Sequence, residues 1–313
     1  FRSVLDLPQM LIPDELLNET QWEQYNELTV QEFPAAYVIP ADEPFQISTH
    51  QPARLVDFLI FNDVQVEKAS KGFTFDGVDY PKGTYIVWMD QPKRGLANTF
   101  LDAGPDLSDI EGLTFYSPPS VSSQPYLWGA SIVVMEEKMD ISTSAVNNAD
   151  KPGGGMTGKK GGAYAYVPTS IAAFQATNDL LAQGVPLFRA TEPFDGFGAG
   201  TIIVPGDPAL ANELANGYAL DVFALKSMPG NVAPMTEQRI AVYGDAGVRQ
   251  ALETLGFDYD SVSTSDLNAG VISGYDVFIN RDLRWSSLSD DGKASVAAWF
   301  AAGGDFVGLG YRG

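Results

Sequence analysis

The sequence predicts an α/β fold in which two similar strand–helix–strand–strand–helix units are followed by a domain with a parallel sheet. Two observations predict it. Short segments rich in Val, Ile and Tyr recur along the 313 residues and alternate with amphipathic stretches of helical length. In addition, one order of motifs occurs twice in the first two thirds of the chain. A chain of this length can form two or three compact domains, each with its own core.

The first part of the chain is expected to contain a lead-in and one α/β unit. Residues 1–35 are rich in Glu and Gln and are expected to form a helical lead-in, or a linker from a preceding domain. The first α/β unit is expected over residues 36–146. Its expected elements are strand 35–42, a helix from about Gln51, strands 63–69 and 83–90, and a helix over 92–103 that begins with a proline.

A Gly- and Lys-rich segment and a second unit follow. Residues 147–162 contain almost nothing apolar, so we expect a mobile loop or hinge there. The second α/β unit is expected over residues 163–236. Its expected elements are strand 163–170, helix 170–184, strands 185–190 and 200–205, and a helix over 207–219 with Asp207 as N-cap.

The two units also resemble one another in local sequence. Phe73 and Phe194 are expected to hold equivalent places. The other similarities are NDVQVEKA (62–69) with QGVPLFRA (183–190), GTYIV (83–87) with GTIIV (200–204), and LAN (96–98) with LAN (210–212). Because the four similarities occur in the same order, they indicate a tandem duplication.

The last region, residues 237–313, alternates strands with helices, and the chain is expected to end within this domain. The expected strands are 239–244, 258–263, 275–280 and 305–310, and the expected helices are 247–257 and 288–304. This alternation predicts a flavodoxin-like parallel sheet with helices on both faces. In such sheets the ligand crevice lies outside the carboxyl ends of the strands.

The charge of the chain restricts its partners. The formal net charge is −21, with a sequence pI near 4.2. Such a surface repels nucleic acid and anionic lipid, and apolar runs such as SIVVM (131–135) are too short for membrane insertion. Calcium is kept as an alternative, although the acidic clusters at 102–112, 258–266 and 289–292 lack the alternating ligand spacing of a calcium loop.

The chain has no cysteine and one histidine, His50. Disulfides, thiol catalysis and thiolate metal sites are therefore excluded for these residues. A single imidazole, without an H-x-x-E or H-E-x-x-H pattern, does not make a two-histidine zinc site. We expect His50 to lie on the surface at the start of a helix.

Two stretches resemble a known family. The run YVIPAD…LVDFLIFNDVQVEKA…KGTYIVWMDQPKRGLANTFLD…PYLWGASI resembles the region downstream of the catalytic domain in large bacterial zinc carboxypeptidases, the carboxypeptidase A-like metallopeptidases. The run QRIAVYGDAGVRQALETLGFDYDSVSTSDLNAG…GGDFVGLG resembles the class I glutamine amidotransferase-like domain that these proteins carry. Together the two stretches extend from about residue 35 to the end of the chain.

The resemblance implies a non-catalytic accessory region with a structural or docking role. It places a peptidase domain before residue 1 as partner, zinc only in that domain, and the protein outside the cytoplasm, in an extracellular, cell-surface or periplasmic location. The family's zinc ligands have no counterparts among these residues. The amidotransferase nucleophile, a cysteine at a strand-to-helix corner, is also missing.

The corner where that nucleophile would be expected is GLGYRG. Gly308 and Gly310 favour a tight turn, and Tyr311 has no neighbouring base that would make it a nucleophile. Arg312 has the chemistry to bind a carboxylate. We therefore expect an architectural turn, with a remnant ligand site at Gly308, Gly310, Tyr311 and Arg312 as the alternative.

A second alternative is a module without enzyme activity that binds a peptide or a cell-surface glycan. The Pro- and Ser-rich stretch 115–137 contains Tyr126 and Trp128, and aromatic side chains in loops provide stacking surfaces. Trp128 leads directly into an apolar strand, so packing in the core is the competing expectation. Pairs of carboxylates that could act in catalysis are inevitable among 40 acidic residues, so their spacing indicates nothing.

Overall fold

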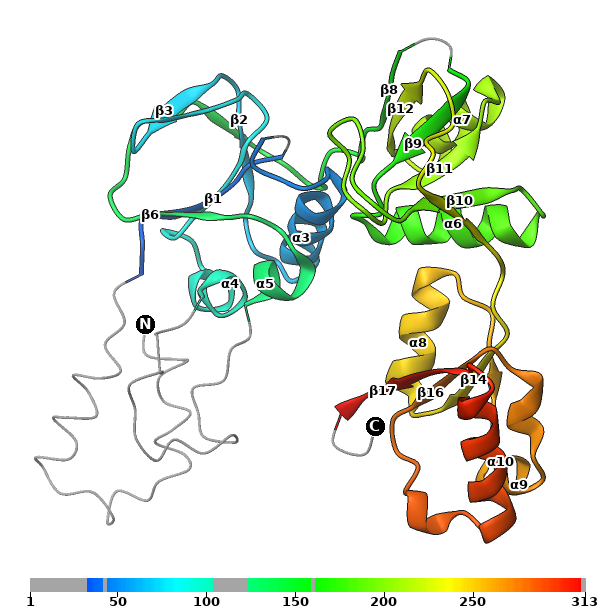
Figure 1. Ribbon diagram of the computed structural model, residues 1–313. Coiled ribbons are helices and arrows are strands. Elements are labelled where there is room, and N and C mark those ends of the chain that lie inside the picture. Colours follow the sequence, from blue (N-terminus) through cyan, green and yellow to red (C-terminus); the bar gives the residue numbers. More distant parts are fainter. Residues whose placement is uncertain (1–32, 42–43, 104–122, 159–160, 311–313) are drawn as a thin grey trace, which may run out of the picture. The chain divides into compact units, whose positions relative to one another are not determined.

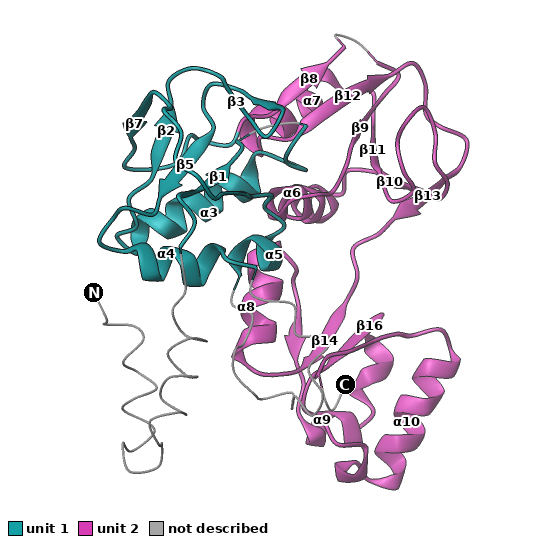
Figure 2. Ribbon diagram, turned by 90° about the vertical axis from the view of Figure 1, so that its left-hand side faces the viewer, with its two compact units in different colours: residues 1–152 teal, residues 153–313 magenta. Residues whose placement is uncertain are grey.

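Figure 1 shows a computed structural model of the chain, which describes residues 33–41, 44–103, 123–158 and 161–310. The chain divides into two compact units, Phe1–Pro152 (unit 1) and Gly153–Gly313 (unit 2) (Figure 2). The described residues form a mixed α/β structure with several sheets, one of them entirely parallel, which confirms the predicted α/β class. Most of the expected lead-in, residues 1–32, lies outside the described residues.

Unit 1 contains an antiparallel sheet, here called the first sheet. Its strand order is β6-β1-β5-β2-β7. A separate hairpin, β3–β4, connects β2 with β5. The elements are β1 (Ala36–Ile39), α3 (His50–Phe61), β2 (Glu67–Ala69), β3 (Phe73–Phe75), β4 (Val78–Tyr80), β5 (Tyr85–Trp88), α4 (Arg94–Leu101), α5 (Gln124–Trp128), β6 (Val133–Met135) and β7 (Thr143–Ala145).

The two faces of the first sheet have different covers. Successive side chains of a strand point to opposite faces. Tyr37 and Tyr85 therefore pack with residues of α3 and α4 on one face. On the opposite face, Ala36 and Ile86 pack with aromatic residues of the hairpin, among them Tyr80.

Unit 2 begins with a second sheet. Its order is β13-β10-β11-β9-β12-β8, and all neighbours are antiparallel except β12 and β8. Helices α6 and α7 cover one face. The elements are β8 (Gly155–Thr157), β9 (Ala163–Tyr166), α6 (Ile171–Ala182), β10 (Leu187–Ala190), β11 (Ile202–Pro205), α7 (Pro208–Gly217), β12 (Asp221–Leu225) and β13 (Val232–Met235).

The two sheets have the same strand order when strands are matched along the chain. The strands β1, β2, β5, β6 and β7 of the first sheet correspond, in this order, to β9, β10, β11, β12 and β13 of the second. With this correspondence, the first order equals the second order read in reverse. The second sheet has one additional strand, β8, beside β12. The register also agrees. Tyr37 is paired with Val87 in the first sheet, as Tyr164 is with Val204 in the second.

The Asp-Gly turns correct one sequence expectation. Asp76 and Gly77 in the β3–β4 hairpin, and Asp195 and Gly196 between β10 and β11, all have positive φ, which Asp and Gly tolerate in tight turns. Each pair directly follows a phenylalanine. The residue that matches Phe194 is therefore Phe75 and not Phe73.

The sequence prediction missed β7, β12, β13 and the β3–β4 hairpin, whereas the apolar strand expected after Trp128 is present as β6. β7 has only three residues, too few for a period-two pattern to be recognised. β13 contains Pro234, which argues against a strand except at an edge, and β13 is an edge strand. The strand–helix–strand–strand–helix description is thus incomplete, because two more strands follow in each case.

The expected Gly-rich loop 147–162 is also partly wrong, because β8 lies within it and pairs with β12. Gly154 allows this. A Cβ atom at Gly154 would lie 2.4 Å from backbone atoms of Ala219 and Leu220 and 2.5 Å from the Ala215 carbonyl oxygen. The absence of a side chain therefore lets this segment approach the turn between α7 and β12.

The rest of unit 2 is a four-stranded parallel sheet of order β15-β14-β16-β17. Helix α8 covers Ile240 and Val242 on one face, and α9 and α10 cover Ala241 and Phe278 on the other (Figure 1). The elements are β14 (Ile240–Tyr243), α8 (Ala246–Leu255), β15 (Asp260–Ser261), α9 (Thr264–Asn268), the 3₁₀ helix Val271–Gly274, β16 (Val277–Asn280), the 3₁₀ helix Trp285–Ser287, α10 (Asp290–Ala301) and β17 (Asp305–Gly308).

The close approach at Gly154 generates a stability prediction. Gly154→Ala is expected to destabilise unit 2 by about 1–3 kcal/mol, because the added methyl group forces the backbone apart. Gly153→Ala is the matched control, since a Cβ atom at Gly153 meets nothing within 4 Å. Urea unfolding of both variants measures the difference, and equal midpoints would contradict the packing described for Gly154.

Candidate functional site

The carboxyl edge of the parallel sheet is the first place to look for a site. β14, β16 and β17 run in the same direction, so the residues that follow them meet at one edge. These residues are Gly244 and Asp245 after β14, Arg281 and Asp282 after β16, and Leu309 and Gly310 after β17. Ligands of such sheets bind outside this edge.

Arg281 connects the three strand ends. Its backbone N–H donates to the Tyr243 carbonyl at 2.9 Å. Its guanidinium lies 3.2 Å from a carboxylate oxygen of Asp282 and 4.0 Å from one of Asp245. Gly310 has a φ of +68°, and a Cβ atom there would lie 3.2 Å from Nη1 of Arg281. Gly310 thus provides both the left-handed turn and the space beside the guanidinium.

Asp245 occupies the N-terminus of α8. Its Oδ1 accepts hydrogen bonds from the backbone N–H groups of Gly247 (2.9 Å) and Val248 (3.1 Å). The bonds from Val248 and Gly247, followed by the charges of Arg281 and Arg249, lower the pKa of Asp245. The protein's own carboxylate therefore satisfies the helix N-terminus, where an anionic ligand would otherwise find donors.

The charged side chains described at this edge balance one another. Arg249 donates from Nη1 to the Gly244 carbonyl at 2.7 Å, and Arg281 lies between two carboxylates. The positive charges of Arg249 and Arg281 thus offset the negative charges of Asp245 and Asp282. This arrangement stabilises the strand ends, and the two positive and two negative charges of these described residues cancel.

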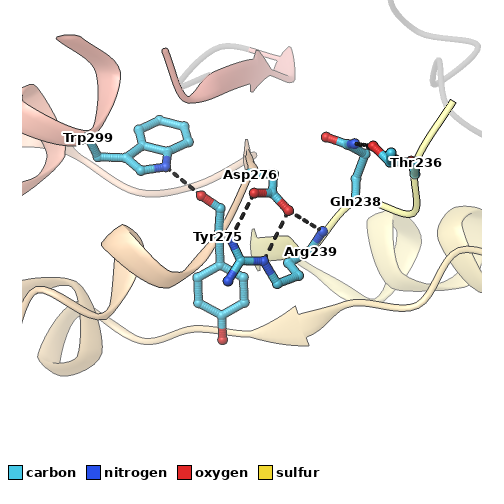
Figure 3. A network of polar contacts seen from close by, with 6 residues as sticks. All are labelled: Thr236, Gln238, Arg239, Tyr275, Asp276 and Trp299. Atoms are coloured by element: carbon cyan, nitrogen blue, oxygen red, sulfur yellow. Dashed lines mark hydrogen bonds and ion pairs between the residues drawn. The ribbon is translucent and has the colours of Figure 1, made fainter. Parts of the chain in front are cut away.

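A second polar cluster lies at the opposite, amino edge of the parallel sheet (Figure 3). Arg239 precedes β14 and Asp276 precedes β16. The Arg239 guanidinium donates from Nε and Nη2 to the two Asp276 oxygens at 3.1 and 2.9 Å, and its backbone N–H donates at 2.9 Å. Trp299 donates from Nε1 to the Tyr275 carbonyl at 2.8 Å. A hollow of about 440 Å³ adjoins these groups.

We interpret this cluster as structural, because it lies at the edge where ligands of parallel sheets do not bind. It fixes the first residues of two neighbouring strands. The hydrogen bonds from Arg239, more than its charge, lower the pKa of Asp276 to about 2. The pair is well exposed, so its contribution to stability is screened by solvent.

The residues predicted from the sequence are not brought together. Tyr126 and Trp128 belong to α5 in unit 1, whereas Gly308 and Gly310 belong to unit 2. Tyr126 is 73% exposed. The Trp128 ring packs on the core, with its centroid 4.9 Å from that of Phe58.

The remaining predicted residues, Tyr311 and Arg312, lie outside the described residues. Sequence reasoning missed Arg281. The available signal was an arginine directly after the apolar strand YDVFIN, at the position where ligand-binding residues of parallel sheets occur.

The described residues offer no ligand set for a catalytic zinc ion. His50 is the first residue of α3, and no group of three or more His, Asp or Glu side chains suitable for a metal occurs in the described ranges. Two of the acidic clusters considered for calcium have structural roles. Asp266 forms a capping box with Ser263 at α9, and Ser289 caps α10, which begins with Asp290 and Asp291. Most of the third cluster, residues 104–112, lies outside the described residues.

Comparison with known proteins gives no match. No family model matches the chain, and neither the curated proteins nor the solved structures give a significant match. The family resemblance therefore rests on the sequence motifs alone. Among the helices that the structure describes, none is long and apolar enough to span a bilayer.

The Arg239–Asp276 pair generates a prediction for acid pH. A carboxyl group with a lowered pKa stabilises the folded state above its unfolded pKa, and this contribution is lost as the pH falls through its folded pKa. Asp276→Asn is therefore expected to lower stability at pH 7, by an amount that shrinks as the pH falls from about 4 towards about 2. Urea unfolding at several pH values measures this. Asp258→Asn, at an exposed position, is the control, and a pH-independent loss in Asp276→Asn would contradict the prediction.

Proposed function

We propose that this chain is a non-catalytic accessory region of a zinc metallocarboxypeptidase-like protein, with a structural or docking role. The observation that carries the proposal is the corner after β17. The resemblance would place a thiol nucleophile there, whereas the chain has Gly310 against the guanidinium of Arg281, which is itself paired with Asp245 and Asp282. A corner whose charges are already paired is suited to holding strand ends in place.

At the level of the fold, we infer a tandem duplication followed by a flavodoxin-like domain. The matched strand order of the first and second sheets and their equal register support the duplication. Numbered along the chain, the parallel sheet has the order 2-1-3-4. This is the order of the first four strands in a flavodoxin-like sheet and supports that assignment.

The partner in this proposal is a peptidase domain that precedes these residues in the same polypeptide. That domain would hold the zinc, and the protein would be extracellular, at the cell surface or periplasmic.

Enzyme assays test the proposal directly. The chain, incubated with Zn²⁺, is expected to turn over neither peptides with free C-termini nor L-glutamine above a buffer control. The attached peptidase domain is expected to unfold at a higher temperature when residues 1–313 are present than when they are deleted. Turnover by this chain that a chelator abolishes would overturn the non-catalytic assignment. An unchanged unfolding temperature would overturn the structural role.

A further inference from the structure

Unit 1 contains a hollow on the face of the first sheet that α3 and α4 leave uncovered. We call it the Trp88 hollow. Its volume is about 600 Å³, and its lining includes Glu67, Trp88, Asp90, Lys138, Asp140 and Ile141. The residues come from β2, from the end of β5 and from the segment between β6 and β7. It combines carboxylates, an aromatic ring and an apolar side chain in one concave place.

The carboxylate of Glu67 is held in a fixed orientation. Its Oε2 accepts hydrogen bonds from Nε1 of Trp88 at 3.0 Å and from the hydroxyl of Thr143. Both donors are neutral, so the negative charge of Glu67 is not balanced by them. The hydrogen bond from Trp88 also fixes the orientation of its indole ring relative to the Glu67 carboxylate.

The ammonium group of Lys138 lies in the part of the hollow formed by Asp90 and the Trp88 ring. Nζ of Lys138 is 2.6 Å from a carboxylate oxygen of Asp90 and 5.3 Å from the centroid of the Trp88 ring. The hydrogen bond from Lys138 lowers the pKa of Asp90. The Lys138 side chain is 62% exposed, so it is free to exchange with solvent. Ring and carboxylate together therefore form a place that accepts an ammonium group.

The net charge of the lining favours a further cation. Three carboxylates, of Glu67, Asp90 and Asp140, stand against the single ammonium of Lys138, which leaves an excess of two negative charges. The apolar side chains of Met139 and Ile141 also line the hollow. They offer contact to the methylene groups of a long basic side chain.

The second sheet shows which residues occupy the equivalent positions there. Glu67 corresponds to Phe188 in the second sheet. Glu67 is paired with Ile86, and Phe188 is paired with the equivalent residue Ile203. Trp88 corresponds to Pro205, because Trp88 is paired with Ala36 and Pro205 with the equivalent Ala163. Thr143 corresponds to Val232, because Thr143 is paired with Ala69 and Val232 with the equivalent Ala190.

This comparison separates scaffold from function. Phe188 and Val232 pack against the apolar cluster of the second sheet, so the scaffold is built there without a carboxylate. A partly buried carboxylate costs desolvation energy, which favours an apolar residue when packing alone matters. The polar set in the first sheet is therefore in excess of what this sheet architecture needs.

We propose that the Trp88 hollow binds the ammonium or guanidinium group of a basic peptide side chain. The incoming cation takes the place of Lys138 at the Trp88 ring and at Asp90, close to Glu67. Lys138 moves into solvent when the ligand binds. This site lies wholly within unit 1 and does not rest on the proposed accessory role.

Titration with small probes tests the proposal. Nα-acetyl-lysine amide and Nα-acetyl-arginine amide are added to the intact chain while the indole N–H signal of Trp88, assigned with Trp88→Phe, is followed by NMR. Both probes are expected to shift this signal in a saturable way. Nα-acetyl-norleucine amide, which has a similar apolar side chain without the charge, is expected to bind at least about tenfold more weakly.

Two variants act in opposite directions. Glu67→Gln is expected to weaken binding of the lysine probe about tenfold, because a neutral amide replaces the charge. Lys138→Met is expected to strengthen binding about two- to fivefold, because it removes the internal competitor. Glu136→Gln and Lys82→Met make the same charge changes at exposed positions outside the lining and are expected to leave the affinity nearly unchanged.

Several outcomes would overturn the proposal. They are the absence of a saturable shift, equal binding of the norleucine probe, or weaker binding in Lys138→Met. A shift caused by N-acetylglucosamine oligomers and not by the basic probes would assign the hollow to a glycan and would equally refute it. Lys138 is a surface residue outside the strands, so its variant tests the proposal even where Glu67→Gln disturbs the fold.

Discussion

The antiparallel pairing of β1 with β5, and of β9 with β11, determines which side chains each face of the first and second sheets presents. Side chains alternate along a strand, so a shift of one residue would exchange the two faces. Tyr37 and Tyr85 in the first sheet, and Tyr164 in the second, are almost completely buried on the helix-covered face. The hydroxyl of Tyr37 donates a hydrogen bond to Oδ1 of Asn98 at 2.8 Å. The register is therefore fixed by large side chains that have only one side of the sheet on which to pack.

The two sheets differ in how they use this common arrangement. Tyr164 corresponds to Tyr37, yet within the described ranges its hydroxyl has no hydrogen-bond partner. Asn212, which corresponds to Asn98 in the repeated LAN motif, donates instead to the Pro208 carbonyl. On the opposite face, the first sheet has the polar set around Trp88 where the second sheet is apolar. The two sheets thus share a backbone pattern, while their polar side chains differ on both faces.

The sequence predicted the elements whose signals are local. The apolar spacing in α3 and α6 and the alternation of strands and helices after residue 237 all lead to elements that the structure contains. The short strands β7, β8 and β13 could not be predicted, because their pairing depends on partners far along the chain. The Trp88 hollow was missed for the same reason. Glu67, Trp88 and Thr143 lie in three separate segments, and only the sheet brings them together.

The apolar side chains of β17 affect how the protein behaves in solution. Phe306 and Val307 are 44% and 41% exposed on a strand at the edge of the described parallel sheet. Such a strand can pair with the same strand of another molecule. At neutral pH, the mutual repulsion of chains that each carry 21 negative charges opposes this contact. Near pH 4.2 this net repulsion vanishes, so charge no longer opposes association through the exposed apolar side chains of β17.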